Sequence, residues 1–316
     1  MTAPSRLPGI AALIFATGSW GLMFVVGKEV LQHVDAFWLT LLRYGVAALL
    51  FAALLLPRGR GPWRRLRRHA APLAGLGFMG FGVFGVLLLA GLAMSVPSHG
   101  AVIVATVPIT AQLVRWALDG VRPGRVTAGT AVLALAGVAI VSGVVFPHAA
   151  APPGSRVALG DGLALLGTLG WVVYSRGPAR FPELDVLEYS ALTVLAAWPL
   201  LAVLTLVATA AGLSSVPDPA TLPRHAPALA YIGVVCSGVA ILAFNYGVRR
   251  LGAVTGTAFM NVVPVSALLG GMATGKTPTA QESTGMAMVI AALLIHTASQ
   301  RIAPRRPDPL TFGAPP

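Results

Sequence analysis

The sequence predicts an all-α integral membrane protein, with ten transmembrane helices arranged as two inverted five-helix repeats around a central cavity. Three observations predict this fold class. Hydrophobic residues make up 56% of the 316 residues and charged residues only 10%, with a mean hydropathy of +0.80. A soluble domain carries about 25% charged residues. Long stretches such as 69–114 and 189–217 contain no Lys, Arg, Asp or Glu. Prolines recur at matching places in the two halves of the chain.

The apolar runs are long enough to cross a membrane many times. A bilayer core of about 30 Å needs about 20 apolar residues per helix. The run 69–114 is too long for one crossing, and Ser95-Val96-Pro97-Ser98 is the natural turn within it. Cutting the runs at Pro, Gly and charged residues predicts helices at 8–30, 36–57, 71–95, 97–118, 126–146, 158–176, 186–210, 227–248, 252–274 and 283–300.

The positions of the basic residues orient these ten segments. Cytosolic loops of membrane proteins carry an excess of Lys and Arg. If both termini and every even-to-odd connection lie on one side, that side collects 17 of the 22 Lys and Arg residues, among them the cluster at 58–68, and the other side only Arg156, Arg224 and Lys276. We therefore expect both termini in the cytosol of a bacterial cell and the helices in its inner membrane. The Pro-rich tail 301–316 is predicted to be a disordered cytosolic end.

Several other classes of protein are disfavoured. The net charge of +12 could indicate nucleic-acid binding, but the arginines lie at predicted helix ends, where they anchor topology. The single cysteine, Cys236, lies in an apolar run and forms no internal disulfide. Gly275-Lys276-Thr277 lacks the spacing of an ATP-binding loop. We expect no cofactor and no metal. An intramembrane enzyme, the remote alternative, would need a catalytic cluster that the sequence does not show.

The two halves, 7–147 and 158–300, carry matching punctuation. Each contributes five segments, and because five is odd the second half must be inverted relative to the first, as in many secondary transporters. The strongest matched feature is a proline in the fourth segment of each half, Pro108 and Pro264. Proline removes a backbone donor, and paired interruptions of this kind indicate a substrate site at a hinge. The alternative is that both prolines only kink helices for packing.

The order of several short motifs resembles the EamA-type drug/metabolite transporter family. The first half contains WGLMFVVGKEV, LLRYGVAALL, the proline of the fourth segment and GTAVLALAGVAIVSG. The second half contains Gly160-Asp161 at the start of the sixth segment, then GWVVYSR, FNYGVRRLGAV, VVPVSALL and GKTPTAQESTG. The resemblance covers nearly the whole chain, and its order across the two halves is more specific than any single motif.

The resemblance implies a fold, a function and one point of doubt. It implies ten helices with a cavity lined by segments 1, 3, 4, 6, 8 and 9. It also implies transport of small metabolites, with the amino-acid exporters as the preferred subgroup. Where the family usually ends each fourth segment with Gly-Glu, this chain has Asp119-Gly120 and Gly275-Lys276. The role of that glutamate is therefore open here. A homodimer is possible, and the sequence does not decide the oligomeric state.

Charged and aromatic residues within the segments are candidates for substrate contact. Ionisable groups inside a membrane are costly and often functional. Lys28 and Arg43 could each meet a substrate carboxylate; alternatively Lys28 reaches the headgroups and Arg43 ties helices together. Trp20, Trp171 and Tyr174 could face the cavity, accept an apolar or aromatic side chain and bind an ammonium group. The alternative for these three is a place in the interfacial aromatic belt.

Three polar residues complete the predicted site. Asn245 and Asn261 lie within the eighth and ninth segments and offer both donors and acceptors, and Asn261 precedes Pro264 by three residues. His99 starts the fourth segment and is the candidate proton carrier, although a structural histidine is the alternative. Asp and Glu lie only near predicted helix ends, whereas ion-driven pumps usually carry a buried carboxylate. We therefore expect uncoupled export of amino acids by alternating access; the alternative is proton-coupled uptake or exchange of another metabolite or drug.

Overall fold

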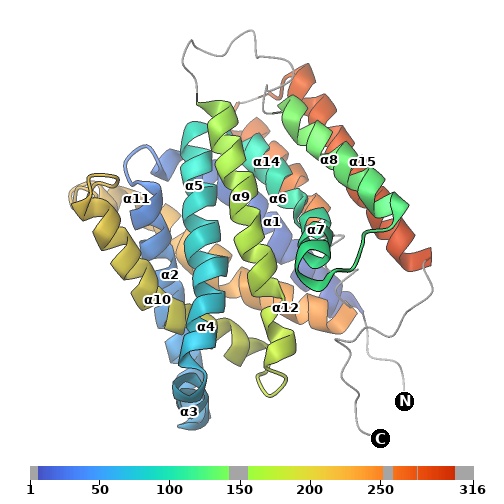
Figure 1. Ribbon diagram of the computed structural model, residues 1–316. Coiled ribbons are helices and arrows are strands. Elements are labelled where there is room, and N and C mark those ends of the chain that lie inside the picture. Colours follow the sequence, from blue (N-terminus) through green and yellow to red (C-terminus); the bar gives the residue numbers. More distant parts are fainter. Residues whose placement is uncertain (1–5, 142–155, 252–258, 276, 303–316) are drawn as a thin grey trace, which may run out of the picture.

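The computed structural model describes residues 6–141, 156–251, 259–275 and 277–302 as a bundle of helices, with no strand among them (Figure 1). The first half comprises α1 (Leu7–Val30), α2 (Ala36–Leu55), α3 (Gly61–Arg68), α4 (Ala70–Gly77), α5 (Phe84–Met94), α6 (Pro97–Ala105), α7 (Val107–Asp119) and α8 (Arg125–Val141). The second comprises α9 (Val157–Ser175), α10 (Val186–Ala210), α11 (Leu222–Ala230), α12 (Ala240–Leu251), α14 (Val262–Ala273) and α15 (Ala280–Ile302).

Short non-α segments join or interrupt these helices. Three 3-10 helices cover Leu56–Arg58, Gly177–Arg180 and Phe259–Asn261. Two π-helical segments, η2 (Phe78–Val83) and η4 (Tyr231–Val239), lie between α4 and α5 and between α11 and α12. π-Helical segments inside long helices often lie at functional sites. Both segments fall in the third predicted crossing of their half.

Within the described residues, six helical segments are long and apolar enough to cross a membrane, and a seventh is a bent pair. The six are Leu7–Val30, Ala36–Arg58, Ala70–Met94, Val157–Arg180, Val186–Ala210 and Leu222–Leu251. The bent pair is α6 and α7, which meet at 47° within the fourth predicted segment, the one that Pro108 interrupts. The prediction of a multi-pass helical membrane protein is confirmed, whereas the count of ten and the inverted repeat stay predictions.

The remaining predicted segments correspond to helices that do not meet the same test. The fifth is α8, with 17 residues, and the ninth contains α14, with 12. Part of the predicted ninth segment, 252–258, lies outside the described residues. The tenth is α15, which continues to Ile302, two residues into the tail predicted to be disordered. The rest of that tail lies outside the described residues.

Side-chain caps explain where several helices begin. The Asp35 carboxylate accepts the backbone N–H groups of Phe37 and Trp38 at the start of α2. Thr279 and Glu282 form a reciprocal capping box at the start of α15, in which each side chain accepts the other residue's backbone N–H. A cap satisfies donors that have no partner within the helix. The box also fixes where the Glu282 carboxylate lies.

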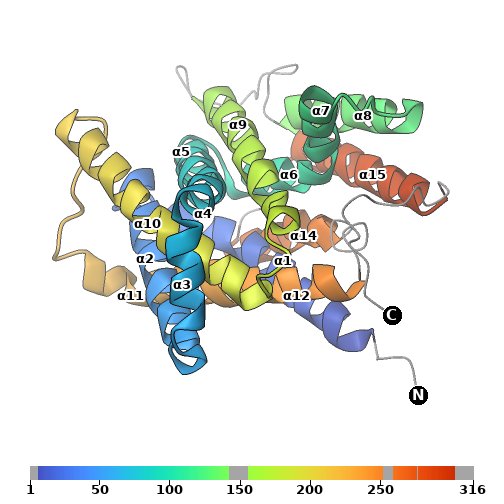
Figure 2. The ribbon, with the colours of Figure 1, turned by 60° about the horizontal axis from the view of Figure 1, so that its bottom comes forward.

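Helices from the two halves pack against one another throughout the bundle. Helix α5 lies along α9, α1 along α12 and α14, α6 along α14 and α9, α8 along α15, and α10 along α2 and α4 (Figures 1 and 2). At the α5–α9 contact the backbones approach closely, since a Cβ atom built on Gly91 would lie 2.3 Å from the Gly160 carbonyl oxygen. Small residues allow such close approach in membranes.

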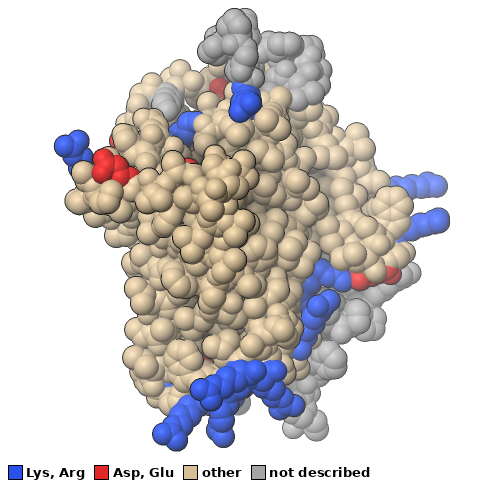
Figure 3. Space-filling view, turned by 60° about the vertical axis from the view of Figure 1, so that its left-hand side comes forward, with Lys and Arg blue, Asp and Glu red and all other residues tan. Residues whose placement is uncertain are grey.

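The charges gather away from the broad apolar flank of the molecule. Figure 3 shows a large uncharged face with Lys and Arg side chains at its lower end. Helix α3, which lies at the lower end of the bundle in Figure 1, has the sequence GPWRRLRR. This distribution is typical of a protein embedded in a bilayer with a basic face toward the cytosol.

The glycine contact between α5 and α9 supplies a test of the packing. In Gly160→Val the new side chain would meet the backbone of Gly91 and the Cβ of Met94, both within 2.8 Å of an ideal Cβ. Overpacking of this kind costs about 1–3 kcal/mol, so the apparent Tm in detergent should fall. Gly162→Val is the matched control, because no atom lies within 4 Å of a Cβ at Gly162 on the same helix. Equal Tm values for the two variants would contradict this packing.

Candidate functional site

Aromatic side chains from four elements meet inside the bundle. The Trp20 ring of α1 lies edge-on to the Trp171 ring of α9, with centroids 5.8 Å apart. Trp20 also lies 5.1 Å from Phe244 of α12, and Trp171 lies 5.4 Å from Phe84 of α5. Trp171 is 8% exposed. The two tryptophans, which the sequence places in corresponding helices of the two halves, therefore contact one another.

A second group of rings extends this contact. Trp171 and Tyr174 are three residues apart on one face of α9, with ring centroids 5.2 Å apart. Tyr174 also contacts Phe81 at 4.7 Å and Tyr189 of α10 at 5.3 Å, and Phe81 contacts Tyr44 of α2 at 4.9 Å. We refer to these side chains as the aromatic cluster: Trp20, Tyr44, Phe81, Phe84, Trp171, Tyr174, Tyr189 and Phe244.

A buried arginine lies at the Tyr44 end of the aromatic cluster. Arg43 is 3% exposed, and its guanidinium carbon lies 4.5 Å from the centre of the Tyr44 ring. Its Nη1 donates to the Met23 sulfur at 3.4 Å, but Nε and Nη2 have no hydrogen-bond partner among the described residues. Glycine at position 85 makes room for it, because a Cβ there would lie 2.8 Å from Nη2. A buried cation without an anionic partner is strongly unfavourable.

Polar groups line the Tyr174 side of the same cluster. The Asn245 side-chain amide donates to the Ser190 hydroxyl at 2.8 Å. The side chains of Ser190, Thr193 and Asn245 lie beside the Tyr174 hydroxyl, which makes no hydrogen bond of standard geometry within the described part of the chain. The structure thus brings Asn245 to the predicted aromatic residues and supplies a hydroxyl and an amide for a polar ligand.

Of two other predicted residues, Lys28 lies away from the aromatic cluster, and the side chain of Asn261 lies outside the described residues. The Lys28 ammonium donates to the carbonyl oxygens of Leu92 and Ala93 at 2.9 and 2.8 Å, which caps the C-terminus of α5. The sequence alternatives for Lys28 were a substrate contact or a headgroup contact, and this cap is neither. Asn261 ends the 3-10 helix Phe259–Asn261, but its side chain lies outside the described residues.

The predicted hinge prolines lie at the starts of helices. Pro108 is the second residue of α7, and the helical path breaks at Thr106 with the 47° bend. The missing N–H of proline explains why the chain opens about one turn earlier. Pro264 lies in the first turn of α14.

His99 belongs to a buried polar group that we name the His99 cluster, which comprises Ser95, Ser98, His99, Asp161 and Glu282. His99 Nδ1 lies 2.8 Å from Asp161 Oδ2, and Nε2 lies 3.5 Å from Glu282 Oε1. Ser95 donates to Asp161, and Ser98 donates to Glu282 at 2.8 Å. His99 and Asp161 are 1% and 2% exposed. Asp161 lies near the start of α9, as the sequence indicates, but it is buried, so the argument for uncoupled transport from the lack of a buried carboxylate does not hold for this residue.

A second set of ionic contacts lies at the opposite end of the bundle. Arg176, next to α9, forms a two-pronged contact with Asp119 of α7, at 2.6 and 2.9 Å. Arg58 pairs with Asp185 and Arg65 with Glu188, which ties the α2–α3 region to the start of α10. Burial opposes ionisation of Asp185, but the Glu188 N–H and Arg58 bring the pKa of Asp185 below its usual value. Asp119, which stands where the family usually has Glu, therefore joins the two halves.

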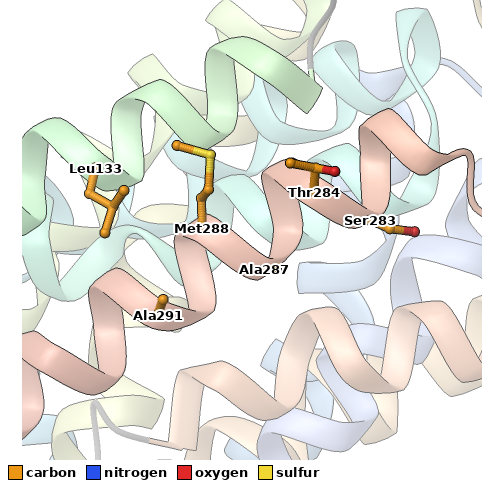
Figure 4. A pocket seen from close by; sticks show the side chains of 6 residues that line it. All are labelled: Leu133, Ser283, Thr284, Ala287, Met288 and Ala291. Atoms are coloured by element: carbon orange, nitrogen blue, oxygen red, sulfur yellow. The ribbon is translucent and has the colours of Figure 1, made fainter.

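The recorded surface grooves lie away from the aromatic cluster. One lies between α8 and α15 and is lined by Leu133, Ser283, Thr284, Ala287, Met288 and Ala291 (Figure 4). The other lies beside α11 and is lined mainly by apolar side chains such as Val46, Leu229 and Val234. Both are shallow and apolar, as expected for surfaces that face lipid. The aromatic cluster itself is packed by its own side chains.

The bundle of long apolar helices defines a class of protein, the multi-pass membrane proteins. The chain belongs to the EamA-like transporter family, whose family model matches residues 7–143 and 158–298. It is similar to a Bacillus subtilis (strain 168) protein called "Uncharacterized transporter YrdR", with 29% identity over 304 residues that cover 93% of this chain and 92% of that protein. A solved structure titled "Crystal structure of protein" superposes with a TM-score of 0.64 and 20% identity over 95% of this chain and all of that one, which supports the fold alone.

The Lys28 cap distinguishes a structural role from substrate binding. Lys28→Met removes two charge-assisted hydrogen bonds to the end of α5. Each such bond contributes about 1.5–3 kcal/mol when well formed and less when partly exposed, so the apparent Tm in detergent should fall by several degrees. The KM for transported substrate should stay within about twofold of the wild-type value. A large rise in KM without a change in Tm would instead place Lys28 in the substrate site.

Proposed function

We propose that this protein is a secondary transporter that exports small zwitterions, most of all amino acids with apolar or aromatic side chains, across the bacterial inner membrane by alternating access. Both termini lie in the cytosol in this proposal. The observation that carries it is Arg43: a guanidinium that is 3% exposed and has donor atoms without acceptors in the described part of the chain, beside a cluster of aromatic rings.

The chemistry of Arg43 selects a carboxylate. A guanidinium presents several N–H donors in a planar fork that matches the two oxygens of a carboxylate. Among the described residues, Arg43 forms no ion pair with an Asp or Glu side chain. A substrate carboxylate would supply both the missing acceptors and the missing negative charge. In the low-dielectric interior this pairing is worth more than it would be in water.

The aromatic cluster suits the rest of an amino acid. Aromatic rings favour offset or edge-on contact with another aromatic or apolar side chain. Their faces also attract an ammonium group. The Asn245 amide and the Tyr174 hydroxyl offer further hydrogen bonds on the same side of the cluster. Because the rings now fill the interior, a substrate would enter only when the helices that carry them separate.

The pattern of helix contacts supports alternating movement of two halves. If the crossings are numbered in order, the contact of the third with the sixth (α5 with α9) matches that of the eighth with the first (α12 with α1). The contact of the first with the ninth (α1 with α14) likewise matches that of the sixth with the fourth (α9 with α6). The two π-helical segments lie in the third and eighth crossings, again a matched pair. Such symmetry is what an inverted repeat predicts.

Counterflow in proteoliposomes tests the proposed substrate. Vesicles loaded with unlabelled amino acid should take up the same amino acid in radiolabelled form only when they contain the protein. Phenylalanine and leucine should exchange faster than glycine, because the aromatic cluster favours apolar side chains. Exchange of a drug or a non-zwitterionic metabolite, with none of any amino acid, would favour the alternative substrate classes over this proposal.

Arg43 supplies the sharpest variant. Arg43→Gln should raise the KM for an amino acid about tenfold or more, the effect of losing about 1.4 kcal/mol or more of pairing energy. The corresponding amino-acid amide, which lacks the carboxylate, should be affected no more in the variant than in the wild type. Arg250→Gln is the control, because Arg250 is exposed and stacks on Tyr246 at 5.1 Å. An unchanged KM in Arg43→Gln would reject the carboxylate site.

Two further variants test the side-chain part of the site. Trp171→Ala removes the ring that contacts Trp20, Phe84 and Tyr174, and Asn261→Ala removes the polar group near Pro264. Each should lower exchange while the protein remains monodisperse in detergent. Unchanged exchange in both variants would move the substrate site away from these residues.

A further inference from the structure

The His99 cluster encloses several ionisable groups at another place within the bundle. His99 lies at the start of α6, Asp161 near the start of α9 and Glu282 near the start of α15. These three helix ends meet at the end of the bundle away from α3. The cluster therefore joins one helix of the first half to two of the second. It lies apart from the aromatic cluster and is not used in the proposed carboxylate site.

The geometry specifies a protonation state. Both ring nitrogens of His99 face carboxylate oxygens, Nδ1 toward Asp161 at 2.8 Å and Nε2 toward Glu282 at 3.5 Å. A neutral imidazole has only one N–H, so one nitrogen lone pair would face a carboxylate. The imidazolium has two N–H donors and satisfies both sides. The serine hydroxyls and the Thr279 N–H complete the shells of the two carboxylates.

Few other charges face this cluster. From α1, Lys28 binds the carbonyl oxygens of Leu92 and Ala93, just before Ser95. Glu29, next to it, is exposed. The parts of α5 and α14 that pack on α6 contain no titratable side chain, and on α8 the one charged residue is Arg125 at its first position. Among the described residues, the charge at the site is therefore set by His99, Asp161, Glu282 and the nearby Lys28 ammonium.

We propose that His99, Asp161 and Glu282 form a proton-binding site that is occupied while the starts of α6, α9 and α15 are together and loses its proton when they separate. The proposal rests on the alternating movement in the proposed function. When the helices part, water replaces the two carboxylates around the imidazole, and the extra proton is no longer held. Proton binding and helix closure then favour one another, as thermodynamic linkage requires.

The opposite end of the same helices gives this site a mechanical partner. Helices α7 and α9 are joined there by the Asp119–Arg176 contact. The bend between α6 and α7 lies between the two contacts. The α6–α7 pair is thus joined to α9 at both ends of the bundle. Opening the interior to either side of the membrane requires the contact at that end to break. A proton on the His99 cluster biases which one opens.

Counterflow at equal internal and external pH tests the proposal, because the orientation of the protein in the vesicle then does not matter. Radiolabelled phenylalanine exchange is measured from pH about 6 to pH about 9, which brackets the usual titration of histidine at about 6.5 and extends above it. In the wild type the rate should rise about tenfold toward high pH, as the closed end is released. This rise corresponds to about 1.4 kcal/mol.

The variants separate a proton site from a structural cluster. His99→Gln and Asp161→Asn should each exchange at a rate that changes little across this pH range, and two variants protect the test if one fails to fold. Arg176→Gln, which removes the contact with Asp119 at the other end of the bundle, should keep the wild-type pH dependence. A flat profile in the wild type, or a wild-type profile in both His99→Gln and Asp161→Asn, would overturn the proposal.

A labelling measurement works without any substrate. Val102 lies one turn inward from His99 and is fully buried, so Val102→Cys in a Cys236→Ser background reports opening through its rate of alkylation by a maleimide. The ratio of the His99→Gln rate to the rate with His99 intact cancels the intrinsic pH dependence of the thiol. It should be large at pH about 6 and near one at pH about 9. A ratio that does not vary with pH would overturn the proton site, even if no amino acid is exchanged.

Discussion

A charge enclosed in a bundle that crosses a bilayer must find its counter-charge inside the protein. Water is absent from the hydrocarbon core, and an unpaired ion there is strongly unfavourable. Asp161 meets this constraint with His99, and Glu188 meets it with Arg65. Arg43 does not meet it within the described residues, because its contacts are a sulfur atom and an aromatic face. In the proposed function, the carboxylate of the substrate completes the pairing of Arg43.

How much of the fold could be predicted from the sequence depended on how local the signal was. Apolar length and arginine position identified α1, α2, α9 and α10 nearly to the residue. Pro108 correctly indicated a break, since the lost N–H is a local property of the chain. The bend angle and the π-helical segments depend on packing between helices. No hydrophobic periodicity in 78–83 or 231–239 predicts the two π-helical segments.

For the site too, the sequence indicated which residues lie together only where they are close in the chain. Trp171 and Tyr174 lie three residues apart, so one helix face had to carry both, and Trp20 was placed by its motif. The pairing of His99 with Asp161 joins residues 62 positions apart, and neither has a local signal of burial. Asp161 was judged by its distance from a helix end. The start of a helix is still buried when two other helices end beside it.

The three features act on different parts of one movement. In the proposed function, Arg43 and the aromatic cluster select the substrate, because they offer a cation and rings where helices of both halves meet. In the proposed proton mechanism, the His99 cluster and the Asp119–Arg176 contact control which end is closed, since they join the α6–α7 pair to α9 at opposite ends. A substrate that enters the aromatic cluster must push α1 and α9 apart, because Trp20 and Trp171 are in contact. Helix α9 also carries Asp161 and directly precedes Arg176. In the proposed mechanism, a displacement of α9 therefore affects both the His99–Asp161 contact and the Asp119–Arg176 contact. Substrate binding in the interior is in this way linked to closure at the two ends.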